Sequence, residues 1–310
     1  MFRFKMLLIG GLVCMGGLAL SACRSGEPAV RESQVQAPGV TLYVRVAGNP
    51  ESGHVLIAIN GGPGFSSHYM LDLEQFAGSD FAVVTYDQRG TGRSGSVPPE
   101  AAHFDLLKYV EDLEAVRETT GADKVHLLGH SWGGLVAMRY ATLYPERVDS
   151  MVLVGSAPPT WQGLAACFQR INARIQQLEQ VGIIPADLPW DDPRRQEALL
   201  RAYLSDPHFW FPADARGSAP EYSLLANQLT WAAVQGYDLS AEVARIEQRV
   251  LIWWGEDDPA GLPMAEETRD ALTNAQVEYV VATRCGHFWH ECPDAFYPRV
   301  RAFLDVPPGP

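Results

Sequence analysis

A Gly-x-Ser-x-Gly motif at residues 129–133 constrains the fold of this chain more than any other feature. An apolar run over residues 125–128 precedes it directly and predicts a buried strand. Residues 135–144 follow it with a helical pattern that stops near Pro145. Strand, tight turn and helix are the context that a nucleophile elbow requires, because the turn lifts the serine hydroxyl out of the sheet. Ser131 is therefore predicted to be a catalytic nucleophile.

Apolar runs alternate with helical patterns along most of the chain. Strands are predicted over residues 41–46, 55–59, 81–86, 148–154, 250–253 and 277–281, and helices over 106–116, 265–272 and 296–304. Strands alternating with helices predict an α/β fold, with a mainly parallel sheet covered by helices on both faces. We expect the core to span residues 39–156 and 241–310.

Residues 157–240 break this alternation. They are aromatic-rich, punctuated by prolines and helix-like, and they follow directly after a predicted strand. Ligands of open α/β sheets bind at the carboxyl ends of the strands. We therefore interpret this block as an inserted helical lid over that edge of the sheet, and not as an independent domain.

The N-terminus has the features of an export signal. Arg3 and Lys5 precede an apolar run that ends at residues 20–23, Leu-Ser-Ala-Cys. This ending resembles a bacterial lipobox, which implies removal of residues 1–22 and lipid attachment to Cys23. Residues 23–38 are then expected to form the lipidated cysteine and a flexible tether. The predicted location is the cell envelope, lipid-anchored to a membrane outside the cytoplasm.

The acidic composition of the chain argues against nucleic acid as a partner. The formal net charge is −13, and no basic patch of the kind that binds nucleic acid is evident. Outside the signal and Cys23, three cysteines remain, Cys167, Cys285 and Cys292, in a spacing that matches no zinc site. We expect no metal and no cofactor. Cys285 and Cys292 lie close together around a candidate base and are predicted to form a disulfide.

A serine nucleophile needs a base, and the base needs an acid that orients it. In this architecture the order along the chain is serine, acid, histidine. Asp258 follows a strand with Gly-x-x-Asp spacing, and His287 stands beside a glycine after the next strand. They are the predicted acid and base, with Asp257 and His290 as the rival candidates.

An oxyanion hole needs two N–H donors that point at one oxygen. Trp132, directly after the nucleophile, is expected to supply one of them. The Gly-rich residues 60–64, Asn-Gly-Gly-Pro-Gly, follow an earlier strand, and Gly62 is expected to supply the other.

These motifs together resemble the α/β-hydrolase superfamily, and within it the proline iminopeptidase branch. The segments that carry the resemblance are Asn60-Gly-Gly-Pro-Gly, Tyr86-Asp-Gln-Arg-Gly-Thr-Gly-Arg-Ser94, Gly129-His-Ser-Trp-Gly-Gly134, Gly255-x-x-Asp258 and Gly286-His287. The resemblance implies a Ser131, Asp258 and His287 triad, with Gly62 and Trp132 at the oxyanion hole. It also implies a structural role for Asp87 and Arg89.

Two positions depart from the pattern of the branch. Asn60 stands where histidine is commoner, and Pro259 stands where some relatives place a glutamate after the triad acid. Glu221 is the candidate that the lid offers for holding a substrate amine, although an exposed acid at a helix start is the plainer interpretation. The lid aromatics Trp161, Trp190, Phe209, Trp210, Phe211 and Trp231 are candidates for a pocket wall.

The sequence thus predicts a membrane-anchored serine hydrolase that cleaves N-terminal residues from short peptides through an acyl-enzyme. A carboxylesterase or lactonase with the same triad is the first alternative. A surface lipoprotein that binds without catalysis is the second. The expected partners are a short peptide or a small ester or amide, and the membrane. The sequence does not indicate an oligomeric state.

Overall fold

The structure is a computed structural model that describes residues 29–209 and 221–305. Its centre is an eight-stranded sheet with the order β1-β2-β4-β3-β5-β6-β7-β8. Strands β3 to β8 are parallel, whereas β2 runs antiparallel to β1 and β4. The strands are β1 (Val30–Ala37), β2 (Val40–Gly48), β3 (Val55–Ile59), β4 (Ala82–Tyr86), β5 (Val125–His130), β6 (Val148–Val154), β7 (Arg249–Gly255) and β8 (Gln276–Ala282).

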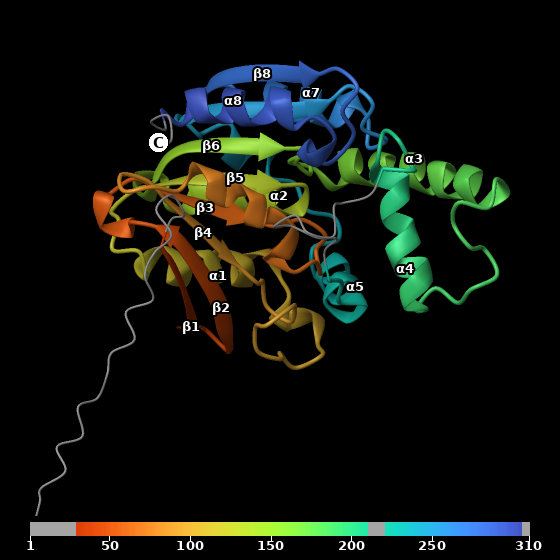
Figure 1. Cartoon of the computed structure of the whole chain (residues 1–310), viewed down its shortest axis with the longest axis horizontal. Coiled ribbons are helices and arrows are strands. Elements are labelled where there is room, and N and C mark those ends of the chain that lie inside the picture. Colours follow the sequence, from red (N-terminus) through yellow and green to blue (C-terminus); the bar gives the residue numbers. More distant parts are fainter. Residues whose placement is uncertain (1–28, 210–220, 306–310) are drawn as a thin grey trace, which may run out of the picture.

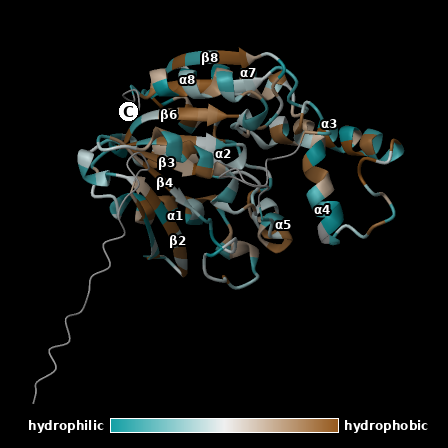
Figure 2. Ribbon diagram, viewed as in Figure 1, coloured by the Kyte–Doolittle hydropathy of each residue, from teal (hydrophilic) through white to brown (hydrophobic). Residues whose placement is uncertain are grey.

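Each face of the sheet carries its own hydrophobic core, because successive side chains of a strand point to opposite faces. On β3, Ile57 and Ile59 belong to one core, while Leu56 and Ala58 belong to the other. The first core is covered by α1 (Leu106–Glu118), α2 (Trp132–Leu143) and α7 (Leu262–Ala271), and the second by η2 (Ser67–Phe76) and α8 (Pro293–Phe303). The apolar strands between the helices stand out in Figure 2. The predicted α/β-hydrolase architecture is confirmed.

A helical insertion lies between β6 and β7. It contains α3 (Trp161–Gln180), α4 (Pro193–Leu199), η5 (Leu200–Tyr203), α5 (Leu224–Ala233) and α6 (Ser240–Val243). Figure 1 shows α3, α4 and α5 beyond the arrowheads of the strands, at the carboxyl edge of the sheet. The lid is therefore above the edge where ligands bind in such sheets. The described residues also contain the short 3-10 turns η1 (Pro50–Ser52), η3 (Ala101–His103), η4 (Pro145–Arg147) and η6 (Trp289–Glu291).

The predicted flexible tether over residues 23–38 is wrong from Val30 onward. Residues 30–37 form β1, which pairs with β2 from Val30↔Ala47 to Ala37↔Val40. The two strands are joined by Pro38-Gly39, where Gly39 has a φ of 80°, as a tight turn requires. Most of this edge strand is exposed on both faces, so its residues are polar and lack an apolar period.

The predicted signal (residues 1–22), Cys23 and the first part of the tether lie outside the described residues. Among the helices of the described ranges, none is long and apolar enough to cross a membrane.

Candidate active site

Ser131 occupies the turn between β5 and α2 in a strained conformation. Its φ is 54° and its ψ is −118°, a region that non-glycine residues rarely adopt. Its neighbours must be glycine because other atoms come very close. A Cβ added at Gly129 would lie 2.5 Å from the Gly133 carbonyl oxygen, and one at Gly133 would lie 2.1 Å from the Ile59 carbonyl oxygen. This crowding holds the sharp turn that the sequence motif predicts.

Asp258 and His287 meet at the same edge of the sheet. Asp258 Oδ2 accepts a hydrogen bond from His287 Nδ1 at 2.7 Å, and Asp258 Oδ1 accepts from the Ala260 N–H at 2.8 Å. Both residues are buried. Because Nδ1 is bonded to the carboxylate, Nε2 of His287 remains for the nucleophile.

The structure places the rival candidates elsewhere. Asp257 is exposed. His290 Nε2 lies 3.0 Å from Asp72 Oδ2 and 3.0 Å from the Tyr69 carbonyl oxygen, and His290 does not line the cavity described below. The geometry therefore favours Asp258 and His287 over both rivals.

Ser131 and His287 line one cavity of about 360 Å³, together with Gly62 and Trp132. No hydrogen bond joins Ser131 Oγ to His287 within the described part of the chain. In unliganded enzymes this contact often tightens only when substrate binds.

Two backbone N–H groups at this cavity are available for an oxyanion. Trp132 is the first residue of α2, so its N–H has no acceptor within the helix. The Gly61 N–H already donates to Tyr69 Oη at 2.7 Å, whereas no acceptor for the Gly62 N–H is found among the described residues. Gly62 has a φ of 118°, which a glycine tolerates best. The arrangement is consistent with the predicted pair, Gly62 and Trp132.

Asn60, which stands where histidine is commoner, forms a hydrogen bond within the glycine-rich loop that it begins. Its Nδ2 donates to the Phe65 carbonyl oxygen at 2.6 Å. The Asn60 carbonyl oxygen accepts from Gln88 Nε2 at 2.8 Å, and Gln88 Oε1 accepts from Trp132 Nε1 at 3.0 Å. The side chain therefore closes the glycine loop on itself, while the backbone carbonyl of Asn60, through Gln88, connects the loop to the elbow.

Tyr69 and His130 form a link that the sequence did not reveal as part of the site. Tyr69 Oη accepts from the Gly61 N–H and lies 2.7 Å from His130 Nδ1. His130 Nε2 lies 3.1 Å from the His287 carbonyl oxygen. Burial holds the pKa of His130 well below its usual 6.5, so this imidazole is neutral. Tyr69 lies in η2, a 3-10 segment without a clear period, and no sequence signal marked it.

Asp87 and Arg89 have the structural roles that the resemblance implies. Asp87 Oδ1 accepts from the Ser67 N–H and hydroxyl, at 2.7 and 2.8 Å. Arg89 forms a buried, two-pronged ion pair with Asp112, at 2.8 and 2.7 Å. Burial raises the pKa of Asp112 to about 6, although Arg89 opposes this rise.

Glu221, the predicted contact for a substrate amine, does not line this cavity. Its side chain is exposed, and its backbone carbonyl accepts from the Ser66 N–H. The next residue, Tyr222, faces the cavity instead, because the segment pairs with Phe65 as a short β-bridge. No carboxylate and no lysine or arginine lines this cavity in the described part of the lid and core.

The cavity wall is mainly apolar and aromatic. Of the predicted wall residues, Trp190 and Trp231 line it, whereas Trp161 packs behind Trp231 and Phe168. Phe209 packs against the other core, and Trp210 and Phe211 lie outside the described residues. The remaining apolar lining comes from Phe65, Ala157, Leu164, Cys167, Phe168, Ile171, Ile175, Leu199, Leu200, Met264 and Phe288.

The predicted Cys285–Cys292 disulfide is confirmed, with a Cα–Cα distance of 5.5 Å. Cys167 is free and buried in the cavity wall, and burial raises the pKa of its thiol to about 12. Within the described ranges, no group of three or more histidine, cysteine, aspartate or glutamate side chains is placed to hold a metal ion.

The elbow serine, the Asp258–His287 pair and the cavity that they share define a serine-type hydrolase. The family model for the alpha/beta hydrolase fold matches residues 54–291, and the chain belongs to this family. The resemblance to the proline iminopeptidase branch is also confirmed. A proline iminopeptidase of Lactobacillus delbrueckii subsp. bulgaricus is 30% identical over 277 residues, which cover 79% of this chain and 87% of the relative.

Solved structures share the fold at lower identity. The proline iminopeptidase of Mycobacterium smegmatis superposes with a TM-score of 0.66 at 20% identity, covering 89% of this chain and 98% of that one. An esterase from Exiguobacterium antarcticum superposes with a TM-score of 0.62 at 19% identity, covering 89% and 100%. These likenesses establish the architecture.

Proposed function

We propose that Ser131 is the nucleophile, His287 the general base and Asp258 the acid that orients it. The observation that carries the proposal is the convergence of the strained serine, the Asp258–His287 hydrogen bond and two available N–H groups on one cavity. Asp258 holds His287 Nδ1–H, so that Nε2 faces the cavity and accepts a proton.

Ser131 Oγ attacks the substrate carbonyl while His287 Nε2 takes the hydroxyl proton. The Gly62 and Trp132 N–H groups bind the resulting oxyanion. His287 then returns the proton to the leaving amine or alcohol, which leaves an acyl-enzyme. Water, deprotonated by the same imidazole, hydrolyses the acyl-enzyme and restores Ser131.

The substrate that we propose is a short peptide or arylamide with an uncharged N-terminal residue. The curated relatives are proline iminopeptidases, and the cavity suits a small apolar residue because its wall is apolar and aromatic. The lid lies over the carboxyl edge of the sheet and would limit entry to short ligands.

The substrate amine needs a partner, because a buried charge without one is costly. With Glu221 outside the cavity, we propose that aromatic faces, those of Trp231 and Tyr222 among them, receive the ammonium group. Such cation–π contacts contribute about 0.5–2 kcal/mol.

Carboxylesterase activity is the second candidate. The observation that favours it is the cavity wall itself, which carries no carboxylate, lysine or arginine in the described part of the chain. An ester with an apolar acyl group brings no charge into this cavity and therefore needs no ionic partner there.

One matched set of substrates separates the two. We would compare proline 4-nitroanilide, its N-acetyl form and a 4-nitrophenyl ester of similar size, with Ser131→Ala as the blank. The aminopeptidase proposal expects the free-amine anilide to react much faster than the acetylated one. Equal rates with and without the acetyl group would contradict it and favour the esterase.

We also propose that the protein is an envelope lipoprotein, held at Cys23 on a membrane outside the cytoplasm. The support for this proposal is the sequence Leu20-Ser21-Ala22-Cys23 after an apolar run. Its partners would then be this membrane and a small substrate.

A further inference from the structure

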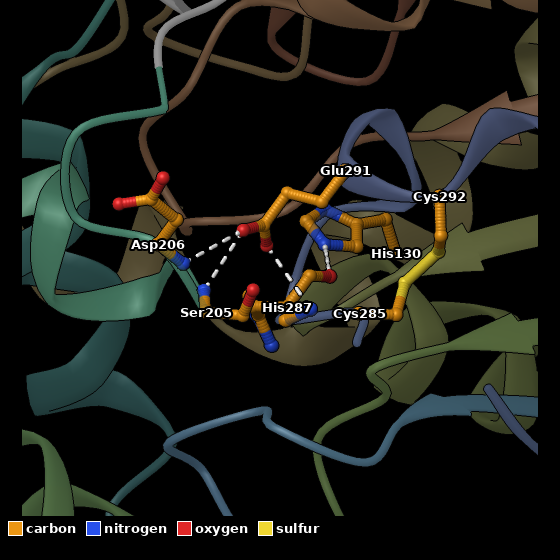
Figure 3. Close-up of a disulfide and its surroundings, with 8 residues drawn as sticks. His130, Ser205, Asp206, Cys285, His287, Glu291 and Cys292 are labelled. Carbon is orange, nitrogen blue, oxygen red and sulfur yellow. Dashed lines mark hydrogen bonds between the residues drawn. A yellow bond between two sulfur atoms is a disulfide. The ribbon is translucent and has the colours of Figure 1, made fainter. Parts of the chain in front are cut away.

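Glu291, the last residue of η6, has no assigned part in the triad yet bonds to both sides of the active site. Its Oε1 accepts from the Ser205 N–H at 2.9 Å and from the Asp206 N–H at 3.2 Å. Its Oε2 accepts from the Gly286 N–H at 3.0 Å. Ser205 and Asp206 belong to the lid, and Gly286 precedes His287 (Figure 3).

The lid is in tight backbone contact with the base loop, residues 285–292, which carries His287. The His287 N–H donates to the Tyr203 carbonyl oxygen at 3.0 Å, and the two rings lie 5.4 Å apart. A Cβ added at Gly286 would lie 2.2 Å from Glu291 Oε2 and 2.5 Å from the Ser205 nitrogen. There is room for the carboxylate bridge only because residue 286 is a glycine.

The disulfide closes the base loop around this bridge. Cys285 and Cys292 flank Gly286, His287 and Glu291, so the loop is fixed at both ends (Figure 3). With its ends tied, the loop can bring the Glu291 carboxylate back to the Gly286 N–H. The same carboxylate then extends across to the lid.

We propose that Glu291 is a positioning residue that couples the lid to the catalytic base. Its carboxylate ties the lid segment Ser205–Asp206 to the residue before His287. The base therefore holds its place against Asp258 while the lid is seated. Movement of this lid segment away from the sheet must break the bridge and the Tyr203–His287 contact together. The inference rests on the proposed role of His287.

Two substitutions of Glu291 weaken the carboxylate bridge to different extents. Glu291→Ala removes all three acceptor contacts. Glu291→Gln keeps one oxygen for the lid N–H groups, but its NH₂ would face the Gly286 N–H, donor against donor. Asp294→Asn is the matched control, because Asp294 is an exposed acid only three residues away.

Misplacement of a catalytic group by about 1 Å can cost about 100-fold in rate. We therefore expect kcat to fall about 10- to 100-fold in Glu291→Ala, less in Glu291→Gln, and not at all in Asp294→Asn. The rate of Ser131 labelling by a fluorophosphonate should fall in the same order. KM should change little, because Glu291 does not line the cavity.

A purely structural role would lower the melting temperature without lowering kcat or the labelling rate of folded protein. That result would overturn the proposal. If Glu291→Ala fails to fold, Glu291→Gln decides, with hydrogen exchange at Ser205, Asp206 and Gly286 expected to be faster than in wild type. A wild-type protein that the fluorophosphonate does not label would overturn the proposed function. Normal labelling in every Glu291 variant would overturn only the coupling.

Discussion

His130 donates a hydrogen bond from Nε2 to the backbone carbonyl of His287, a residue 157 positions later, at 3.1 Å. A carbonyl can only accept, so Nε2 carries the proton of the neutral imidazole, and Nδ1 on the other side accepts from Tyr69 Oη. One chain of hydrogen bonds therefore runs from the glycine loop to the base loop. It fixes His130 as the neutral Nε2–H tautomer and connects the two halves of the site.

Removing the Tyr69 hydroxyl should damage catalysis more than folding. In Tyr69→Phe the Gly61 N–H loses its acceptor and His130 loses its donor, while the buried ring remains. A buried group left unpaired costs about 1–3 kcal/mol. We expect a lower kcat with little change in KM, measured on the preferred anilide at fixed pH. Tyr297→Phe, which removes a hydroxyl bonded to Asp72 away from the cavity, serves as the control. Unchanged kcat in Tyr69→Phe would contradict the link.

The acid of the triad can be identified by two neighbouring substitutions. Asp258→Asn leaves the shape intact but removes the carboxylate that orients His287, and comparable changes lower kcat by about 10⁴. Asp257→Asn changes an exposed side chain and should have little effect. Ser131→Ala and His287→Ala should each lower kcat by several orders of magnitude without unfolding. Steady-state kinetics on folded protein, verified by circular dichroism, would check this. A larger loss of kcat in Asp257→Asn than in Asp258→Asn would exclude Asp258 as the acid of the triad.

The elements that the sequence predicts best are those with a strong local pattern. The buried strand β3 begins and ends where its apolar run does, at Val55 and Ile59, and β6 likewise spans Val148–Val154. The elbow could be predicted because Gly129 and Gly133 are required locally by the turn. Asp258 and His287 could be predicted because each follows a recognisable strand end.

Other features depend on partners far along the chain. Strand β1 was missed because an exposed edge strand needs no apolar residues, and only its pairing with β2 makes it a strand. The bridge from Glu291 to Ser205 spans 86 positions, and no spacing rule connects them. The exact path of the lid, and no local pattern, decides that Tyr222 and not Glu221 lines the cavity.

The stability of the protein should fall in mild acid because of His130. Burial lowers its folded-state pKa well below 6.5, so the unfolded chain binds this proton more readily. The free energy of unfolding then falls as the pH drops below about 6.5, by up to about 1.4 kcal/mol per pH unit from this residue. Urea unfolding of wild type and His130→Gln between pH 7 and pH 5 measures the difference in slope. His68→Gln, at an exposed histidine, should keep the wild-type slope. Parallel slopes for His130→Gln and wild type would refute the assignment.

The Arg89–Asp112 pair should be costly to break. Both side chains are 1% exposed, so Asp112→Asn leaves the Arg89 charge buried without its carboxylate. Loss of one partner of a buried pair typically costs about 3–5 kcal/mol. Asp270→Asn breaks an exposed pair with Arg269 and should cost less than about 1 kcal/mol. Chemical denaturation at pH 7 compares the two variants. Equal costs would show that the buried pair does not stabilise the fold.

The proposed membrane anchor depends on lipid attachment to Cys23. If the lipobox resemblance holds, the intact protein should sediment with membranes and incorporate labelled fatty acid, and Cys23→Ser should abolish the labelling. Cys14→Ser, a cysteine inside the signal, is the matched control and should leave both unchanged. Labelling that persists in Cys23→Ser would contradict the anchor.

The fold adds a second expectation to this prediction. Val30 pairs with Ala47, beside the amino end of β4, whereas Ser131 follows the carboxyl end of β5. The end of the molecule nearest the proposed anchor is thus opposite the lid. An extended chain spans at most about 3.6 Å per residue, so the tether from Cys23 to Val30 is short. The lid should therefore face away from the membrane and remain open to soluble substrates.

We expect the same kcat/KM for a soluble anilide from the anchored protein and from a fragment that starts at residue 29, which keeps β1. A marked loss of kcat/KM on anchoring would show that the membrane obstructs the lid.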